Sequence, residues 1–320
     1  MELTLNAEAA ALRHEQLSFE TGIVVPIGQK LLTPEIRARE PFFEALVSWN
    51  VRMQRQTGMT VELRVRDGDD WSPWLFVGEW GAVPDELERV TEFDGGRIDV
   101  DFFTSDGEFD AIQLRFDVHG QGSIELRRFD LCLTGAQEPK RSGESRPSSR
   151  RYVCLDVPTR SQRTEEESIR DRICSPTTVA MVMEYRGVSR PTSEVARLLY
   201  DERNDIYGNW TRAIQGAYEL GVPGYLTRIS DWSSAERIVM QGQPLVASIR
   251  TPEEGLTGAP YVSTAGHLLV IVGFDEVGNV IVNDPAAETA EEVRLVYPRH
   301  EMEQAWMGKG GVAYVFLRPE

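Results

Sequence analysis

The chain has 320 residues, 41% of them hydrophobic, and a formal charge of −17, which is typical of a globular protein large enough for two domains. The negative charge argues against nucleic acid or an anionic membrane as a partner, because both are bound through clustered lysine and arginine. No apolar run is long enough for a membrane span, and residues 1–20 lack the basic start and apolar core of a signal peptide, so we expect a cytoplasmic protein, or a secreted one if a signal peptide has been removed.

The first half of the chain has the pattern of an all-β region. From about residue 42 to residue 134, short segments alternate apolar and polar residues and are separated by turns rich in glycine and aspartate. In 112–118 every second residue is apolar, so one face of that strand is buried. Other expected strands are 60–66, 97–103 and 123–133. We predict a β-sandwich accessory domain over 42–135, with residues 1–41 as a segment that leads into it.

Four tryptophans fall in this half: Trp49, Trp71, Trp74 and Trp80. Large aromatic rings are mostly buried, so we expect them to fill the core or cover its edge. Exposed rings could instead stack on sugars, which makes a carbohydrate partner the alternative. Through the triplet 48–50 (Ser-Trp-Asn) and the run 71–74 (Trp-Ser-Pro-Trp), the region resembles the jelly-roll, galactose-binding-like domains that precede some bacterial peptidase domains. The acidic turn 67–70 matches no complete calcium loop, so we expect no metal there.

Residues 136–151 are rich in serine, proline, glycine and charged residues, with no apolar residue after Ala136. Such a segment cannot form a core, and we predict a linker between two domains.

The second domain, 152–320, begins with an extended segment at 152–158. Helices are then expected at 176–187, 192–201 and 210–220, because apolar residues recur at spacings of three and four. After these helices the pattern changes to strands, with short helices at 233–240 and 301–307; the expected strands are 222–229, 244–249, 267–274, 279–282, 293–297 and 312–317. Helices followed by a mostly antiparallel sheet predict an α+β domain.

The first of these helices is preceded by a cysteine. Cys174 lies where an extended segment becomes a helix, and Pro176 falls in the first turn. The backbone N–H groups at a helix start have no intrahelical partners and present partial positive charge. A thiol at such a point loses its proton more readily, and the thiolate is the nucleophile. Cys174 is therefore a candidate nucleophile that needs a base, a group to orient the base, and an oxyanion donor.

A hairpin further along the chain offers the base and its partner. The apolar strand 267–274 begins with His267, a turn rich in glycine and asparagine follows, and the returning strand leads directly to Asp284. Both residues therefore lie at the open end of the hairpin. A carboxylate beside an imidazole fixes its tautomer and stabilises the imidazolium, which would also lower the pKa of a nearby thiol.

At these residues the sequence resembles the papain-like cysteine peptidases of the group that contains the double-glycine leader peptidases, which trim bacteriocin precursors. The resemblance covers 153–316 and implies a papain-like α+β fold. It is carried by Asp156-Val157-Pro158 followed by Gln162, the 174–178 run Cys-Ser-Pro-Thr-Thr, Gly266-His267-Leu268, Gly273-Phe274 and Asn283-Asp284-Pro285-Ala286.

Carried over residue by residue, the resemblance implies that Cys174 is the nucleophile, His267 the general base and acid, and Asp284 the orienting carboxylate. Gln162, twelve residues before the cysteine, matches the glutamine that donates to the oxyanion together with the cysteine N–H. Such preorganised donors are typically worth about 3 kcal/mol each. The sequence departs from the family at Ser175, where the family usually has glycine, a change expected to narrow or polarise the site.

Three residues are candidates for contact with substrate: Ser175 beside the nucleophile, and Asn209 and Trp210 in a segment that could line the groove. For Asn209, helix capping explains the residue about as well. The loop 251–265 is expected to border the cleft and carries no decisive chemistry.

We predict a cysteine peptidase that cleaves a peptide or protein substrate through an acyl-thioester on Cys174, with no cofactor and no metal; only the family implies the peptide. One alternative is a papain-fold acyltransferase or transglutaminase-like enzyme, which shares the order Cys, His, Asp. The other is an inert binding module whose β-sandwich recognises carbohydrate or peptide, since each triad residue alone has an ordinary structural interpretation. Cys132 and Cys154 lie in expected strands and are assigned to the core, and three scattered cysteines predict neither a disulfide nor a zinc site.

Overall fold

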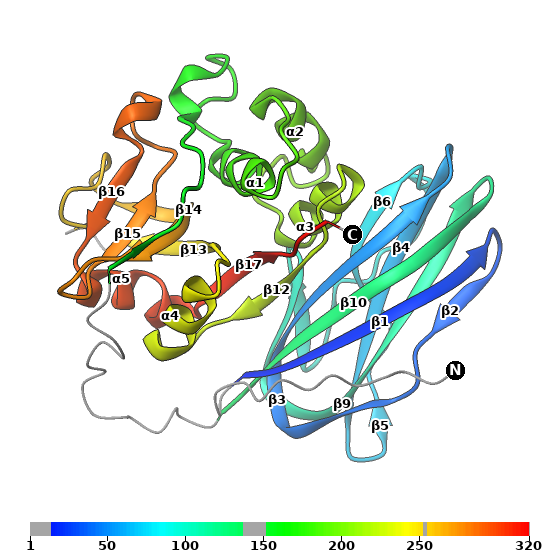
Figure 1. The fold of residues 1–320 in the computed structure, drawn as a ribbon. Helices are drawn as coiled ribbons and strands as arrows, with labels where there is room; N and C mark the ends of the chain where they lie inside the picture. Colours follow the sequence, from blue (N-terminus) through cyan, green and yellow to red (C-terminus); the bar gives the residue numbers. More distant parts are fainter. Residues whose placement is uncertain (1–13, 137–151, 252–254, 320) are drawn as a thin grey trace. The chain divides into compact units, whose positions relative to one another are not determined.

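The computed structural model describes residues 14–136, 152–251 and 255–319. The chain divides into two compact units, 1–139 and 140–320, each with its own sheet (Figure 1). Apart from Ala136, the predicted linker 136–151 lies outside the described residues.

The described part of the N-terminal unit is built from antiparallel strands. Hydrogen bonding joins them in the order β1-β10-β3-β9-β4-β5; β2 and β8 also pair with β9, β6 pairs with β4, and β7 pairs with β8. The strands are β1 (His14–Pro26), β2 (Lys30–Leu32), β3 (Ile36–Met53), β4 (Thr57–Asp67), β5 (Asp70–Trp71), β6 (Leu75–Gly81), β7 (Glu92–Phe93), β8 (Gly96–Asp99), β9 (Phe102–Gly120) and β10 (Ser123–Gly135).

Two layers of this sheet face each other across one core. Trp49 of β3 lies against Gly78 of β6, where an added Cβ would come within 3.1 Å of the indole ring. The rings of Phe116 in β9 and Phe129 in β10 are 6.0 Å apart, although β3 separates their strands in the sheet. The prediction of an all-β sandwich is therefore confirmed.

The start of the β-region differs from the predicted residue 42, because β1 begins at His14 and pairs along its length with β10. The register of this pair shifts between Glu20 and Ile23, which interrupts the alternation of buried side chains and hid the strand in the sequence. The expected strand 97–103 is also broken. Val100 has a φ of 61°, so β8 ends at Asp99 and β9 begins at Phe102.

The four tryptophans of this unit are packed as the core interpretation predicts. Trp49 and Trp80 are buried. Trp71 and Trp74 are half-buried, and the guanidinium carbon of Arg64 lies 4.4 Å and 4.8 Å from their ring centroids. Arg115 lies 4.7 Å from the ring of Trp74. This arrangement gives the carbohydrate alternative no support, because the rings already pack on arginine side chains.

The C-terminal unit has helices first and an antiparallel sheet afterwards, which confirms the predicted α+β class. Its sheet runs in the order β12-β17-β13-β14-β15-β16, with β11 paired to β14. The elements are β11 (Val153–Cys154), α1 (Cys174–Tyr185), α2 (Thr192–Leu199), α3 (Trp210–Glu219), β12 (Gly224–Arg228), α4 (Trp232–Met240), β13 (Leu245–Thr251), β14 (Thr264–Phe274), β15 (Val280–Asn283), β16 (Arg294–Tyr297), α5 (Arg299–Ala305) and β17 (Val312–Phe316).

Helices cover both faces of this sheet. α4 and α5 pack on one face, where Trp232 and Trp306 meet edge to face with centroids 5.9 Å apart. α1 covers the other face beside β14 (Figure 1). Ser175 of α1 contacts Tyr314 of β17. The neighbours of Tyr314 in the strand, Ala313 and Val315, point the other way, into the core beneath α4 and α5. Every residue of α1 from Ser175 to Met183 is buried, whereas Cys174 at the start of the helix is only partly buried.

None of the helices in the described residues is long and apolar enough to cross a membrane. Of the cysteines outside α1, Cys132 is buried in β10 as predicted, whereas Cys154 in the two-residue strand β11 is only partly buried.

Candidate active site

Cys174 is the first residue of α1. Ile173 precedes it without a side-chain cap, and Pro176 occupies the first turn. The first N–H groups of the helix therefore remain directed at its start. Cys174 is partly buried and residues 175–183 are buried, so the residue lies at the helix start where the sequence predicts a nucleophile.

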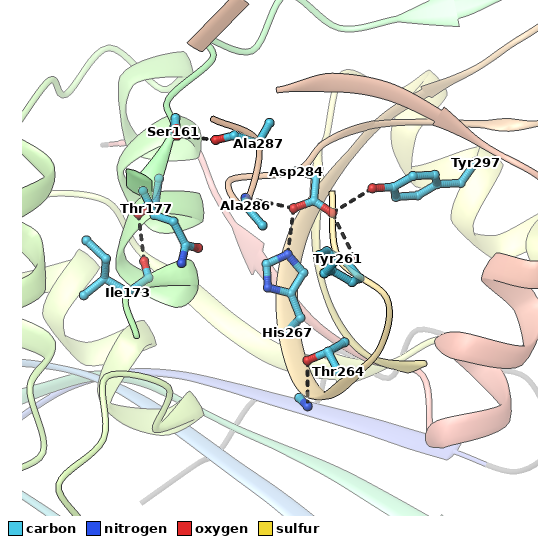
Figure 2. A network of polar contacts seen from close by, with 12 residues as sticks. Ser161, Ile173, Thr177, Tyr261, Thr264, His267, Asp284, Ala286, Ala287 and Tyr297 are labelled. Carbon is cyan, nitrogen blue, oxygen red and sulfur yellow. Dashed lines mark hydrogen bonds and ion pairs between the residues drawn. The ribbon is translucent and has the colours of Figure 1, made fainter. Parts of the chain in front are cut away.

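The hairpin of β14 and β15 brings His267 and Asp284 together. Val270 pairs with Asn283, so His267 near the start of β14 and Asp284 just after β15 reach the same end. His267 Nε2 lies 2.7 Å from Asp284 Oδ1, and both side chains are buried (Figure 2). The predicted pairing of these residues is present. Since Nε2 faces the carboxylate, Nδ1 is the ring nitrogen left for the thiol.

Asp284 accepts further hydrogen bonds on both of its oxygens. The N–H of Ala286 donates to Oδ1 at 3.0 Å. The hydroxyls of Tyr297 and Tyr261 donate to Oδ2 at 2.8 Å and 3.0 Å (Figure 2). A buried carboxylate that accepts this many hydrogen bonds is stabilised in its ionised form.

The electrostatics of the three groups favour a thiolate beside an imidazolium. Burial lowers the pKa of His267, but the charge of Asp284 and hydrogen bonds to Asp284 and Cys174 outweigh it and raise the pKa to about 10. Burial raises the pKa of Cys174. The hydrogen bond to His267, the charge of His267, and hydrogen bonds from the N–H groups of Leu268 and Ser175 outweigh this effect and hold the pKa of the thiol below its ordinary value. Burial also raises the pKa of Asp284, and the charge and hydrogen bond of His267 reverse this effect.

Gln162 is held between the two halves of the site. It begins the short 3-10 helix η1 (Gln162–Thr164), and its N–H donates to the carbonyl of Pro285, the residue after Asp284. Its side-chain Nε2 donates to the carbonyl of Arg170 at 2.7 Å, four residues before Cys174. The side-chain oxygen is buried and has no hydrogen-bond partner in the part of the chain that the structure describes.

Two of the residues predicted to contact substrate are engaged elsewhere. Ser175 is fully buried and its hydroxyl faces Tyr314 at 3.3 Å, because one helical step turns its side chain toward the sheet. Asn209 is the N-cap of α3, accepting from Arg212 N–H at 2.9 Å and donating to Asp201 at 2.9 Å. Both side chains therefore already have partners within the protein, which leaves their predicted contact with substrate without support from their positions. Trp210 is the half-buried first residue of α3.

The sequence does not predict that Tyr261 and Tyr297 belong to this site. Tyr261 belongs to the loop 251–265, whose sequence carries no decisive chemistry, yet it contacts both Asp284 and the ring of His267. No local pattern marks either tyrosine, since each reaches Asp284 from a different element. The described residues contain no group of three or more His, Cys, Asp or Glu side chains placed to hold a metal ion.

A sheet covered by a buried helix, with a cysteine at the helix start and a histidine–aspartate pair at the end of a hairpin, defines the papain-like α+β class of cysteine peptidase domains. Residues 154–314, just over half of the chain, match the Peptidase_C39 like family, and residues 28–127 match the Peptidase C39 N-terminal domain. The chain belongs to the Peptidase_C39 like family, as the resemblance in its sequence predicted. No curated protein matches the chain.

Three solved structures are similar to the chain. A protein from Bacillus anthracis described as a C39-like peptidase has 20% identity and a TM-score of 0.40 over 53% of this chain and 100% of its own. A double glycine motif protease from an AMS/PCAT transporter, in complex with a leader peptide, has 19% identity and a TM-score of 0.36; the match covers 52% of this chain and 95% of that one. The peptidase domain of Streptococcus ComA, a bi-functional ABC transporter, has 13% identity and a TM-score of 0.37; the match covers 51% of this chain and 99% of that one. The family membership rests on the sequence match, because these TM-scores and identities are low.

Proposed function

We propose that the C-terminal unit hydrolyses a peptide bond through an acyl-thioester on Cys174. The observation that carries the proposal is the 2.7 Å contact of His267 with Asp284, combined with the effect of His267 on the pKa of the Cys174 thiol. A thiolate is the nucleophilic form of cysteine, and a neighbouring imidazolium makes it available at neutral pH. Membership of a peptidase family supports a peptide as the substrate.

In this mechanism the sulfur of Cys174 attacks the scissile carbonyl carbon and forms the C–S bond. The carbonyl oxygen becomes negative and accepts hydrogen bonds from the N–H of Cys174 and from Nε2 of Gln162. His267 gives its proton to the amine as the C–N bond breaks, leaving the acyl-thioester. His267 then takes a proton from water, which attacks the thioester carbonyl and releases the acid and the thiolate. Asp284 holds the imidazole in place through both steps.

The test is hydrolysis of a peptide library by the full-length protein and by Cys174→Ala, with products identified by mass spectrometry. Cys154→Ala is the matched control, since Cys154 is also a free, partly exposed cysteine. Cleavage is expected to vanish in Cys174→Ala and to persist in the control. Cleavage that persists unchanged without Cys174 would refute the mechanism. Products that carry an added amine in place of a new carboxylate would instead identify acyl transfer.

A further inference from the structure

Two tyrosine hydroxyls converge on one oxygen of Asp284. Tyr297 donates to Oδ2 from β16 at 2.8 Å, and Tyr261 donates to the same oxygen from the loop between β13 and β14 at 3.0 Å (Figure 2). The other oxygen, Oδ1, meets His267 and the N–H of Ala286. The two oxygens of the carboxylate thus have different partners: Oδ2 accepts from the two phenols, and Oδ1 faces the imidazole.

This division matters because rotation about χ2 of aspartate has broad minima that repeat about every 180°. The side chain therefore does not fix the orientation of its own carboxylate. Asp284 is fully buried, and a buried carboxylate oxygen without a partner is costly. Partners on Oδ2 therefore decide how Oδ1 is presented to His267. Among the described residues, the one backbone group that donates to this carboxylate is the N–H of Ala286, and it contacts the other oxygen, Oδ1.

Tyr261 makes a second contact with the pair. Its ring meets the imidazole of His267 edge to face, with centroids 5.0 Å apart. Hydrogen bonds anchor the chain on either side of Tyr261. Thr257 donates its N–H and hydroxyl to the Glu301 carboxylate at 2.6 Å and 2.9 Å, and the N–H of Thr264 donates to the hydroxyl of Thr251 at 2.8 Å. Tyr261 therefore meets both members of the pair from a segment, 257–264, that is hydrogen-bonded at both of its ends.

We propose that Tyr261 and Tyr297 are positioning residues of the His267–Asp284 pair, an inference that rests on the proposed function. Their hydroxyls hold Oδ2 so that Oδ1 faces the imidazole, and the ring of Tyr261 keeps the imidazole turned toward the carboxylate. They act through Asp284 and His267 and touch neither the thiol nor the scissile bond.

The kinetic test uses Tyr261→Phe and Tyr297→Phe in the full-length protein, with a peptide that the unmodified protein cleaves. Each change removes one hydroxyl and keeps the ring. We expect kcat to fall about tenfold, a part of what general acid–base catalysis contributes, with KM within about twofold. The matched control is Tyr185→Phe, which removes a hydroxyl that donates to the Gly242 carbonyl at 3.2 Å from the last residue of α1. An equal loss in the control, or a loss confined to KM, would overturn the proposal.

A second test needs no substrate and separates this proposal from the peptidase mechanism. The chain has 4 histidines, so the imidazole of His267 can be titrated by NMR in histidine-labelled protein and assigned with His267→Gln. In either tyrosine variant the titration midpoint of His267 should fall by about one pH unit, a tenfold loss of proton affinity, because a displaced carboxylate stabilises the imidazolium less. An unchanged midpoint would overturn the proposal. A higher midpoint would overturn it too, since it would mean that the hydroxyls only weaken the charge of Asp284.

Discussion

At the scale of single residues, the hydrogen bonds of Gln162 bear on its proposed role as an oxyanion donor. A primary amide nitrogen carries two N–H groups, and the carbonyl of Arg170 takes one of them at 2.7 Å. We expect the other to be the one that donates to the oxyanion. The partner of the first N–H lies four residues before Cys174, so the contact fixes the amide relative to the segment that carries the nucleophile.

Replacing Gln162 with alanine is expected to lower kcat about 100-fold with little change in KM, because an oxyanion donor acts mainly in the transition state. Steady-state kinetics on a cleavable peptide measure this. Gln243→Ala is the control, since the Gln243 amide also donates to a backbone carbonyl, that of Phe316, at 2.9 Å. If both variants lost activity equally, the effect would be one of folding and Gln162 would have no special role.

The pH dependence of kcat/KM follows from the lowered pKa of Cys174 and the raised pKa of His267. The reactive ion pair needs a thiolate and an imidazolium, so activity should rise with pH through the lowered pKa of Cys174, below the ordinary thiol value of about 8.5. It should fall again as His267 loses its proton near pH 10. Burial lowers the pKa of His267 and the charge of Asp284 raises it, so Asp284→Asn should move the falling limb to lower pH.

The control for this profile is Asp275→Asn at the opposite end of the same hairpin, where Asp275 accepts from the N–H groups of Val277 and Asn279. Its profile should match that of the unmodified protein. A falling limb that stays near pH 10 in Asp284→Asn would show that Asp284 does not support the imidazolium.

At the scale of elements, the segment from β11 to Gln162 is fastened along the β14–β15 hairpin. The N–H of Leu155 donates to Val272, Asn283 donates its side-chain amide to the Val157 carbonyl at 3.1 Å, and the hydroxyl of Ser161 donates to Ala287 (Figure 2). One continuous run of contacts thus places Gln162 beside the residues that follow Asp284. The Asp-Val-Pro and Asn-Asp-Pro-Ala motifs lie together for this reason.

Gly273 allows this approach, since a Cβ there would lie 1.9 Å from the Val153 carbonyl oxygen and 2.8 Å from Cys154 Cα. Gly273→Ala should therefore force β11 away from β14 and lower the free energy of unfolding by about 1–3 kcal/mol, the usual cost of overpacking. Urea unfolding of the full-length protein measures it. Gly266→Ala in the same strand is the control, because nothing lies within 4 Å of its added Cβ. Equal stabilities would show that β11 can move without cost.

At the scale of the whole molecule, the helices, strands and hairpin of the C-terminal unit could be predicted because their periodicity is local. The β14 strand is a nearly continuous apolar run, and the buried residues of α2 recur at helical spacing. What could not be predicted depends on the third dimension. The pairing of β1 with β10 and the contacts of Tyr261 and Tyr297 with Asp284 join residues distant in the chain, and the inward turn of Ser175 depends on which face of α1 the sheet covers.

The edge-to-face pair of Trp232 and Trp306 gives the C-terminal unit an optical signature of its own. Two indole rings 5.9 Å apart, fixed by burial, couple their electronic transitions, so circular dichroism should contain an exciton couplet that vanishes when α4 and α5 separate from the sheet. A couplet assigned to this pair would report the melting of the peptidase domain within the intact chain.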